Sequence, residues 1–151
     1  MNTFEEIIQF AIESEYKAAA FYQHMLTLNQ AAGMRSFFER LVKQEMGHAA
    51  KLKNISKHQV SRSDKTDQPD PGLSMADYLV VSVDDESNLS YQDAVILAMK
   101  KEKAAVQLYQ DLMNKTTDPE LKALFAFIME EEKGHQAAFE DEYDKRIQSD
   151  N

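Results

Sequence analysis

Two short motifs in this sequence pair a glutamate with a histidine three residues later, at 45–48 and at 132–135. On an α-helix, residues three apart project from the same face, so both side chains of a motif enter the same space. Apolar residues flank each motif at helical spacing, with Leu41 and Leu52 around the first and Phe139 after the second. This pattern turns the motifs toward the interior, where carboxylates and imidazoles ligate metal ions.

Two further glutamates lie in the middle of apolar stripes. Glu15 and Glu102 have apolar residues three and four positions away on both sides, and each is followed seven residues later by a tyrosine, Tyr22 or Tyr109. An inward carboxylate without a partner is costly, because burial removes it from water. We therefore predict six metal ligands: Glu15, Glu45, His48, Glu102, Glu132 and His135.

The charges of these residues indicate what kind of ion they would bind. Four ionised carboxylates in one interior space would repel one another strongly. The nearby lysines, at positions 17, 43, 100, 101 and 133, are expected on other faces of their helices. Two divalent cations would bring the site close to neutrality. Carboxylate with imidazole suits iron or manganese, although the same ligands could also take zinc.

The sequence contains an internal repeat. When residues 11–50 are aligned with residues 98–137, an offset of 87, ten of 40 positions are identical, against about two or three by chance. The identical pairs include the four glutamates, both motif histidines and both tyrosines. The protein is therefore predicted to be a duplicated helical hairpin.

Helical periodicity covers two stretches of the chain, at about 3–60 and 90–148, and a polar, turn-rich connection at about 61–89 separates them. Two hairpins whose helices are each about 40 Å long need a connection that runs back along the bundle, and about 30 residues are long enough for it. We therefore predict one all-α domain over residues 1–151, a four-helix bundle of two hairpins joined by a long crossover.

Several residues mark where helices begin. Thr3 has a glutamate three residues later, the spacing of a capping box, Ser90 is a candidate N-cap, and Asp118–Pro119 combines an N-cap with proline at the first helical position. The second helix is expected to begin near Ala32, and a short helix is expected over 74–83.

The composition excludes several classes of protein. The 151 residues include no cysteine, which rules out disulfides, thiol catalysis and cysteine-bound metal. Seventeen basic and 26 acidic residues give a net charge of −9, which opposes binding to nucleic acid or to an anionic membrane. No apolar run approaches the roughly 20 residues of a membrane span. We expect an acidic, cytoplasmic domain with no nucleic-acid or membrane partner.

The motifs together resemble those of a known family. Glu15 and Glu102, each with its tyrosine, and the stretches 45–48 and 132–135 make the chain similar to a rubrerythrin-type member of the ferritin-like di-iron carboxylate superfamily, over about 115 of the 151 residues. The resemblance implies that Glu45 and Glu132 bridge two iron ions. It also implies that the other four predicted ligands bind the two ions terminally: Glu15 with His48, and Glu102 with His135.

The chain also departs from rubrerythrins. Their rubredoxin module holds an iron with four cysteines, and this sequence has no cysteine, so electrons are expected from an external electron-transfer protein. Rubrerythrins have an additional glutamate one turn before the third-helix ligand, where this sequence has Met99. The remaining set of four glutamates and two histidines is also similar to the centre of bacterioferritins.

The resemblance implies an oxidoreductase that reduces a small-molecule oxidant, hydrogen peroxide or dioxygen, with a role in oxidative stress. Tyr22 and Tyr109 are expected in the core, with their hydroxyls near the ligands, and Glu130 and Glu131 are expected in solvent. Two alternatives remain open: a non-catalytic iron-handling protein with incidental ferroxidase activity, and a structural dimerisation module that retains the site. A homodimer is expected, since relatives commonly pair through the first hairpin.

Overall fold

The computed structural model of the chain describes residues 1–28, 33–61, 70–80 and 86–147, and of residues 57–61, 87 and 147 it describes only the backbone. It contains four long helices: α1 (Phe4–Met25), α2 (Arg35–Ser61), α3 (Tyr91–Lys115) and α4 (Pro119–Glu142). Short helical turns accompany them, among them the 3-10 turns η2 (Met75–Tyr78) and η3 (Glu86–Asn88) and the π-helical turn η4 (Tyr143–Ile147). The described residues contain no strand, which confirms the all-α class.

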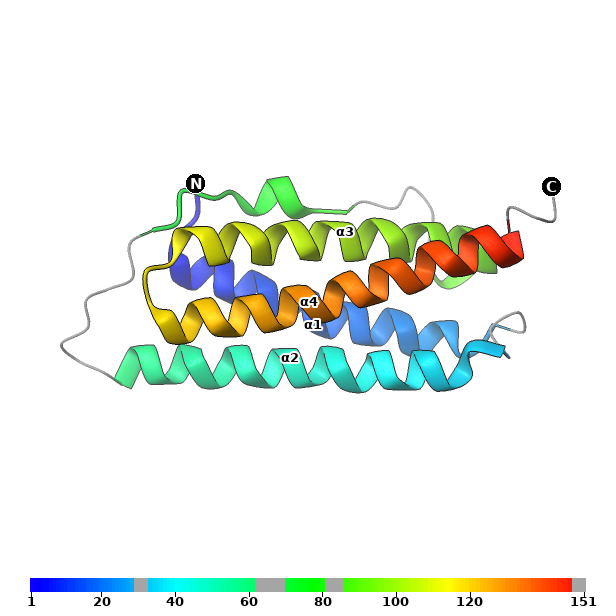
Figure 1. Cartoon of the computed structure of the whole chain (residues 1–151), viewed down its shortest axis with the longest axis horizontal. Coiled ribbons are helices and arrows are strands. Elements are labelled where there is room, and N and C mark those ends of the chain that lie inside the picture. Colours follow the sequence, from blue (N-terminus) through cyan, green and yellow to red (C-terminus); the bar gives the residue numbers. More distant parts are fainter. Residues whose placement is uncertain (29–32, 62–69, 81–85, 148–151) are drawn as a thin grey trace.

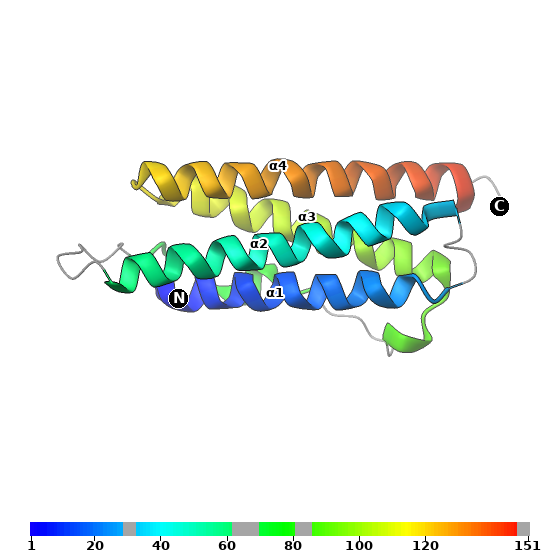
Figure 2. The ribbon, with the colours of Figure 1, turned by 90° about the horizontal axis from the view of Figure 1, so that it is seen from below.

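The helices form two antiparallel hairpins, α1 with α2 and α3 with α4, which pack on each other lengthwise (Figures 1 and 2). α2 ends and α3 begins at opposite ends of the bundle, so the chain must return along the molecule between them (Figure 1). In the described part of this connection, η2 lies along α3, where the Tyr78 hydroxyl donates a hydrogen bond of 2.6 Å to Asp111. The predicted four-helix bundle with a crossover is confirmed.

Three helices begin where the sequence predicted. The Thr3 side chain accepts a hydrogen bond from the backbone amide of Glu6, whose carboxylate accepts one in return, so the capping box is complete. Ser90 caps α3 through the backbone amide three residues later, and Asp118 caps α4 ahead of Pro119. Such side chains satisfy backbone amides that have no partner within the helix.

Two expected helices differ from the structure at their ends. α2 begins at Arg35, after a 3-10 turn at Gly33 and Met34, and the expected start near Ala32 lies outside the described residues. The helix expected over 74–83 is only the short turn η2, since Ser74 makes no side-chain capping bond and the backbone is already extended at Leu79. Residues 81–83 of that expectation lie outside the described residues.

The apolar core consists of two clusters at successive levels of the bundle. The first, which we call the Phe125 cluster, includes Ile8 of α1, Leu52 of α2 and Tyr109 of α3. The second, the Phe38 cluster, lies on the other side of the bundle's middle and includes Tyr22, Val95 and Phe139. Along every helix, the predicted ligand glutamate falls between the residues of one cluster and those of the other. The polar centre is therefore closed off above and below by apolar side chains.

The length and apolar character of the helices test the expectation that the chain has no membrane span. Within the ranges that the structure describes, no helix combines the length and the apolar character that a membrane span needs.

Candidate metal centre

All four long helices contribute to one buried polar centre. Its six residues, each at most 5% exposed, are those predicted from the sequence: Glu15 of α1, Glu45 and His48 of α2, Glu102 of α3, and Glu132 and His135 of α4. They form two groups in which one ligand atom from each residue lies within 4.8 Å of all the others. The first group is Glu15, Glu45, His48 and Glu132, and the second is Glu45, Glu102, Glu132 and His135. Glu45 and Glu132 belong to both groups.

The two groups follow the internal repeat. Each contains one glutamate from α1 or α3, both central glutamates, and one histidine from α2 or α4. Because the contributing residues differ by the 87-residue offset, the two halves of the centre have matching donor sets. Two ions bound in these groups would share Glu45 and Glu132, the residues that the resemblance implies as bridging ligands.

Each histidine turns its Nδ1 atom toward three carboxylates. His48 Nδ1 lies 3.1 Å from Glu15, 3.3 Å from Glu45 and 3.3 Å from Glu132. His135 Nδ1 lies 3.7 Å from Glu45, 3.5 Å from Glu102 and 3.4 Å from Glu132. Nδ1 is therefore the nitrogen that each imidazole would offer to an ion at the centre.

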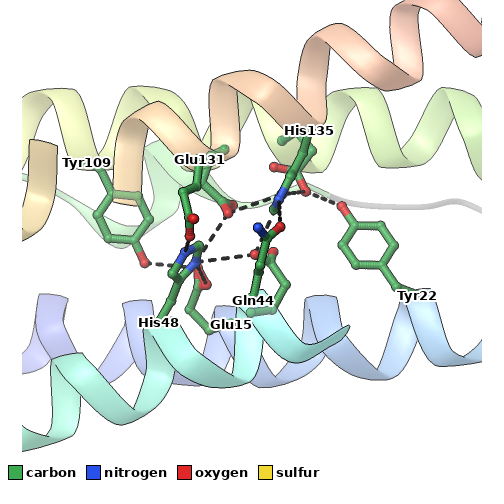
Figure 3. A network of polar contacts seen from close by, with 10 residues as sticks. Glu15, Tyr22, Gln44, His48, Tyr109, Glu131 and His135 are labelled. Atoms are coloured by element: carbon green, nitrogen blue, oxygen red, sulfur yellow. Dashed lines mark hydrogen bonds and ion pairs between the residues drawn. The ribbon is translucent and has the colours of Figure 1, made fainter. Parts of the chain in front are cut away.

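The other ring nitrogen of each histidine contacts a residue of the opposite hairpin. His48 Nε2 donates to Glu131 Oε1 at 2.5 Å, and His135 Nε2 donates to Gln44 Oε1 at 2.6 Å (Figure 3). These hydrogen bonds hold a proton on Nε2 and orient the ring, as the outer partners of metal-binding histidines commonly do. The expectation that Glu131 lies in solvent was wrong, since its side chain is 28% exposed and bonded to His48. Glu130 is 68% exposed, as expected.

Sequence reasoning missed Gln44 and Glu131, although a signal was present. Each directly precedes a central glutamate, and the 87-residue offset pairs the two positions. Residues one apart on a helix point about 100° apart, so neither was expected beside a ligand. Each side chain contacts the histidine of the facing helix, and not a residue of its own helix.

The two tyrosines contact the centre from the opposite hairpin. Tyr22 of α1 donates its hydroxyl hydrogen bond to Glu102, and Tyr109 of α3 donates to Glu15 at 3.3 Å (Figure 3). Both side chains are fully buried. Each terminal glutamate is thus held by a phenol of the other repeat.

Burial and mutual repulsion keep protons on three of the four carboxylates when no ion is bound. Burial, and then the charge of Glu132, raises the pKa of Glu15 to about 8 and that of Glu102 to about 8. Burial and the charge of Glu15 also raise the pKa of Glu45 well above its usual range. Burial acts the same way on Glu132, but the close approach of His135 and His48 outweighs it and holds its pKa well below the usual range.

The histidines carry positive charge under the same conditions. Burial alone would lower the pKa of His135, but the close approach of the Glu102 and Glu132 carboxylates outweighs burial and raises that pKa to about 9. In the same way, burial is outweighed by the nearby carboxylates of Glu132, Glu15 and Glu45, which raise the pKa of His48 far above its usual range. Protons therefore balance the charge of the centre in the absence of metal.

Four buried polar atoms of the centre nevertheless lack a hydrogen bond to any described residue. They are Glu45 Oε1, Glu102 Oε2, Glu132 Oε1 and His135 Nδ1. Buried polar atoms are normally bonded, so atoms left without a bond at one place indicate a missing partner. Carboxylate oxygens and imidazole nitrogens are donors that iron and manganese accept. The residues present therefore fit two divalent ions.

A cavity of about 140 Å³ reaches the centre between α1 and α3. The four glutamates form its inner wall, and Tyr78, Leu79 and Val80 of the crossover lie on its outer side. Lys17 and Lys101, which were expected on other faces of their helices, also line the cavity. Lys101 Nζ lies 3.3 Å from Glu86 and packs over the ring of Phe21.

Comparison with known proteins agrees with this geometry. The sequence model of the rubrerythrin family matches residues 6–143, which include the four long helices apart from the first two residues of α1, and all six residues of the centre. No curated protein sequence and no solved structure matches the chain. Rubrerythrins are ferritin-like helical bundles with a di-iron centre, and the buried carboxylates and histidines found in the bundle fit such a centre. The chain therefore belongs to the rubrerythrin family.

Proposed function

We propose that this protein is a di-iron carboxylate oxidoreductase that reduces hydrogen peroxide or dioxygen with electrons from an external donor. The observation that carries the proposal is the pair of buried ligand groups that share Glu45 and Glu132 and contain polar atoms without hydrogen bonds. A purely structural core would have no use for four buried carboxylates, because each is costly to bury without a cation.

Each residue of the centre has a proposed role. Glu45 and Glu132, which belong to both groups, would bridge the two ions. The terminal positions would be filled by the remaining four residues: Glu15 with His48, and Glu102 with His135. Two adjacent iron ions would supply the electrons that the oxidant takes up when its oxygen–oxygen bond is reduced. Manganese or zinc could occupy the same donors, but zinc has no redox chemistry.

The chain's own groups would supply access and protons. The cavity between α1 and α3 leads to the glutamates and has room for a small oxidant. Reduction of peroxide to water consumes one proton for each electron, so proton donors must lie nearby. Tyr22 and Tyr109 each hold a hydroxyl proton against a terminal glutamate.

The lining of the cavity favours an oxidoreductase over an iron-handling protein. Once two divalent ions balance the four carboxylates, Lys17 leaves a positive charge along the cavity, whereas Lys101 is paired with Glu86. Positive charge along a path disfavours the passage of further cations, whereas it leaves a neutral or anionic oxidant free to enter. We therefore place ferroxidase or storage activity second.

Anaerobic reconstitution with iron(II) tests the proposal. We expect two iron ions per chain, followed by rapid consumption of added peroxide or dioxygen and growth of the near-ultraviolet absorption of oxidised iron. The double variant Glu45→Ala/Glu132→Ala should bind no iron pair. Glu130→Gln, at an exposed position of α4, should behave like wild type. Iron uptake far beyond two ions per chain would favour storage. Absence of binding by the wild type, or unchanged binding by the double variant, would refute the proposal.

A further inference from the structure

The internal duplication is broken at one contact of the metal centre. Positions 44 and 131 are related by the 87-residue offset, but the first is glutamine and the second is glutamate. Both side chains accept a hydrogen bond from the Nε2 atom of the opposite hairpin's histidine: Glu131 from His48 at 2.5 Å, and Gln44 from His135 at 2.6 Å (Figure 3). The geometry of the two contacts is nearly the same, and their charge differs.

The residues that would bind the ions do not explain this difference. The two terminal glutamates, the two central glutamates, the two histidines and the two tyrosines are identical between the repeats. The partners of the two histidine Nε2 atoms do differ: one is the carboxylate of Glu131 and the other is the amide of Gln44. The two halves of the centre have the same donors but different support for their imidazoles.

A carboxylate and an amide affect an imidazole to different extents. A hydrogen bond to an ionised acceptor is roughly twice as strong as one between neutral groups. A carboxylate that accepts from one ring nitrogen makes the other nitrogen a stronger donor, and replacing such outer partners typically changes metal affinity by about 10- to 100-fold. The amide of Gln44 orients His135 but brings no charge. Nδ1 of His48 should therefore be the stronger metal donor.

We propose that the two metal positions are inequivalent, and that the position formed by Glu15 and His48 binds its divalent ion more tightly and fills first because Glu131 supports His48. The position formed by Glu102 and His135 fills second and releases its ion more readily. This inference rests on the proposed function, because it takes the six residues to be metal ligands. It adds an order in which the two positions fill, which the identical donor sets alone do not predict.

Calorimetric titration with cobalt(II), without oxidant, measures this order directly. The wild type should show two binding steps, each of one ion per chain. Glu131→Gln should weaken the tighter step by about 10- to 100-fold and bring it close to the weaker step. Gln44→Glu should strengthen the weaker step by a similar factor. Both substitutions nearly preserve side-chain shape, and circular dichroism checks that each variant keeps its helices.

The double exchange Gln44→Glu/Glu131→Gln is the matched control, because it keeps the composition and net charge of the protein. Two separate binding steps should persist, but the tighter step should now belong to the position formed by Glu102 and His135, and the weaker step to the position formed by Glu15 and His48. In the wild-type background, Glu15→Ala should remove the tighter step. In the exchanged background, Glu102→Ala should remove it.

The outcomes separate this inference from the proposed function. Two bound ions with equal affinities, or two steps that Glu131→Gln leaves unchanged, would overturn the inequivalence and leave the metal centre standing. If the wild type bound no cobalt, both the inference and the proposed centre would be wrong. A weakened tighter step in Glu131→Gln together with the exchanged dependence in the double variant would support the inference.

Discussion

Tyr22 donates a hydrogen bond to Glu102, a residue 80 positions away in the other repeat, and Tyr109 donates the corresponding hydrogen bond to Glu15 of the first repeat. The two hairpins are therefore joined at the centre of the bundle by a pair of crossed contacts between a phenol and a carboxylate. Tyr22 also stacks on Phe139 and Phe38, so the same side chain links the polar centre to the apolar Phe38 cluster.

Replacing Tyr22 with phenylalanine should destabilise the metal-free protein. The change leaves a buried oxygen of Glu102 without its donor, and a loss of this kind costs about 1–3 kcal/mol. Chemical denaturation followed by circular dichroism measures the effect. Tyr16→Phe is the matched control, because Tyr16 packs beneath Lys53 away from the ligand contacts. Equal stability of the two variants would show that the Glu102 contact contributes nothing.

Metal affinity should rise steeply with pH. Glu15 and Glu102, each with a pKa raised to about 8, must lose their protons before they can ligate an ion. Each bound ion should therefore release protons, and the apparent Kd should fall as the pH increases from about 6 to about 9. Calorimetry in buffers of different ionisation enthalpy counts the protons. Binding that is independent of pH over this interval would contradict the pKa shifts.

The stability of the metal-free protein should change with pH in the opposite sense. Glu15 and Glu102 have a pKa of about 8 when folded, against 4.5 as model groups, so the folded state holds protons that the unfolded state has released. Their contribution is fully present below about pH 4.5 and is lost as the pH rises through about 8. His135, with a folded pKa of about 9 against 6.5, contributes stability that is lost as the pH rises from about 6.5 through about 9.

The double variant Glu15→Gln/Glu102→Gln tests this pH dependence. Glutamine resembles the protonated carboxyl group but does not titrate, so the free energy of unfolding should decline less between about pH 5 and about pH 8 than in the wild type. Denaturant titrations at several pH values, with chelator present, provide the measurement. A decline as steep as that of the wild type would assign the pH dependence to other groups.

Filling the cavity should slow the reaction with oxidant without removing the metal. Ala105 is half-buried and lines the cavity one turn beyond Glu102. Ala105→Leu should keep two ions per chain but slow the oxidation of bound iron by about tenfold or more, which corresponds to roughly 1.4 kcal/mol on the barrier. Stopped-flow absorbance measures the rate.

Ala123→Leu is the control for this cavity experiment, because Ala123 is exposed on α4. That variant should oxidise iron at the rate of the wild type. If Ala105→Leu also reacts at the wild-type rate, the oxidant reaches the centre by another route.

Much of the architecture could be predicted because it depends on residues close together in the sequence. The capping oxygens of Thr3, Ser90 and Asp118 act on amides within the next few residues, so their effect does not depend on the rest of the fold. Glu45 and His48 share a helical face at a spacing of three, wherever that helix packs. The repeat then indicated that the second hairpin does the same with Glu132 and His135.

The lysines show where such reasoning fails. Lys101 directly precedes Glu102, so its backbone position faces away from the ligand direction on α3. Its long, flexible side chain nevertheless lies along the cavity, between Glu86 and the ring of Phe21. Helical periodicity specifies where a side chain begins, but a chain of four methylene groups can end on a different face.

The sequence by itself determined the helices, the duplication and the six candidate ligands, because periodicity and spacing within one helix are local properties. Only the tertiary structure decided that Glu131 meets His48, that Gln44 meets His135 and that each tyrosine reaches the other repeat's glutamate. Those contacts join different hairpins, and they depend on how far each helix is rotated and shifted against its neighbour. Core packing sets that rotation and shift, and no pattern within a single helix records it.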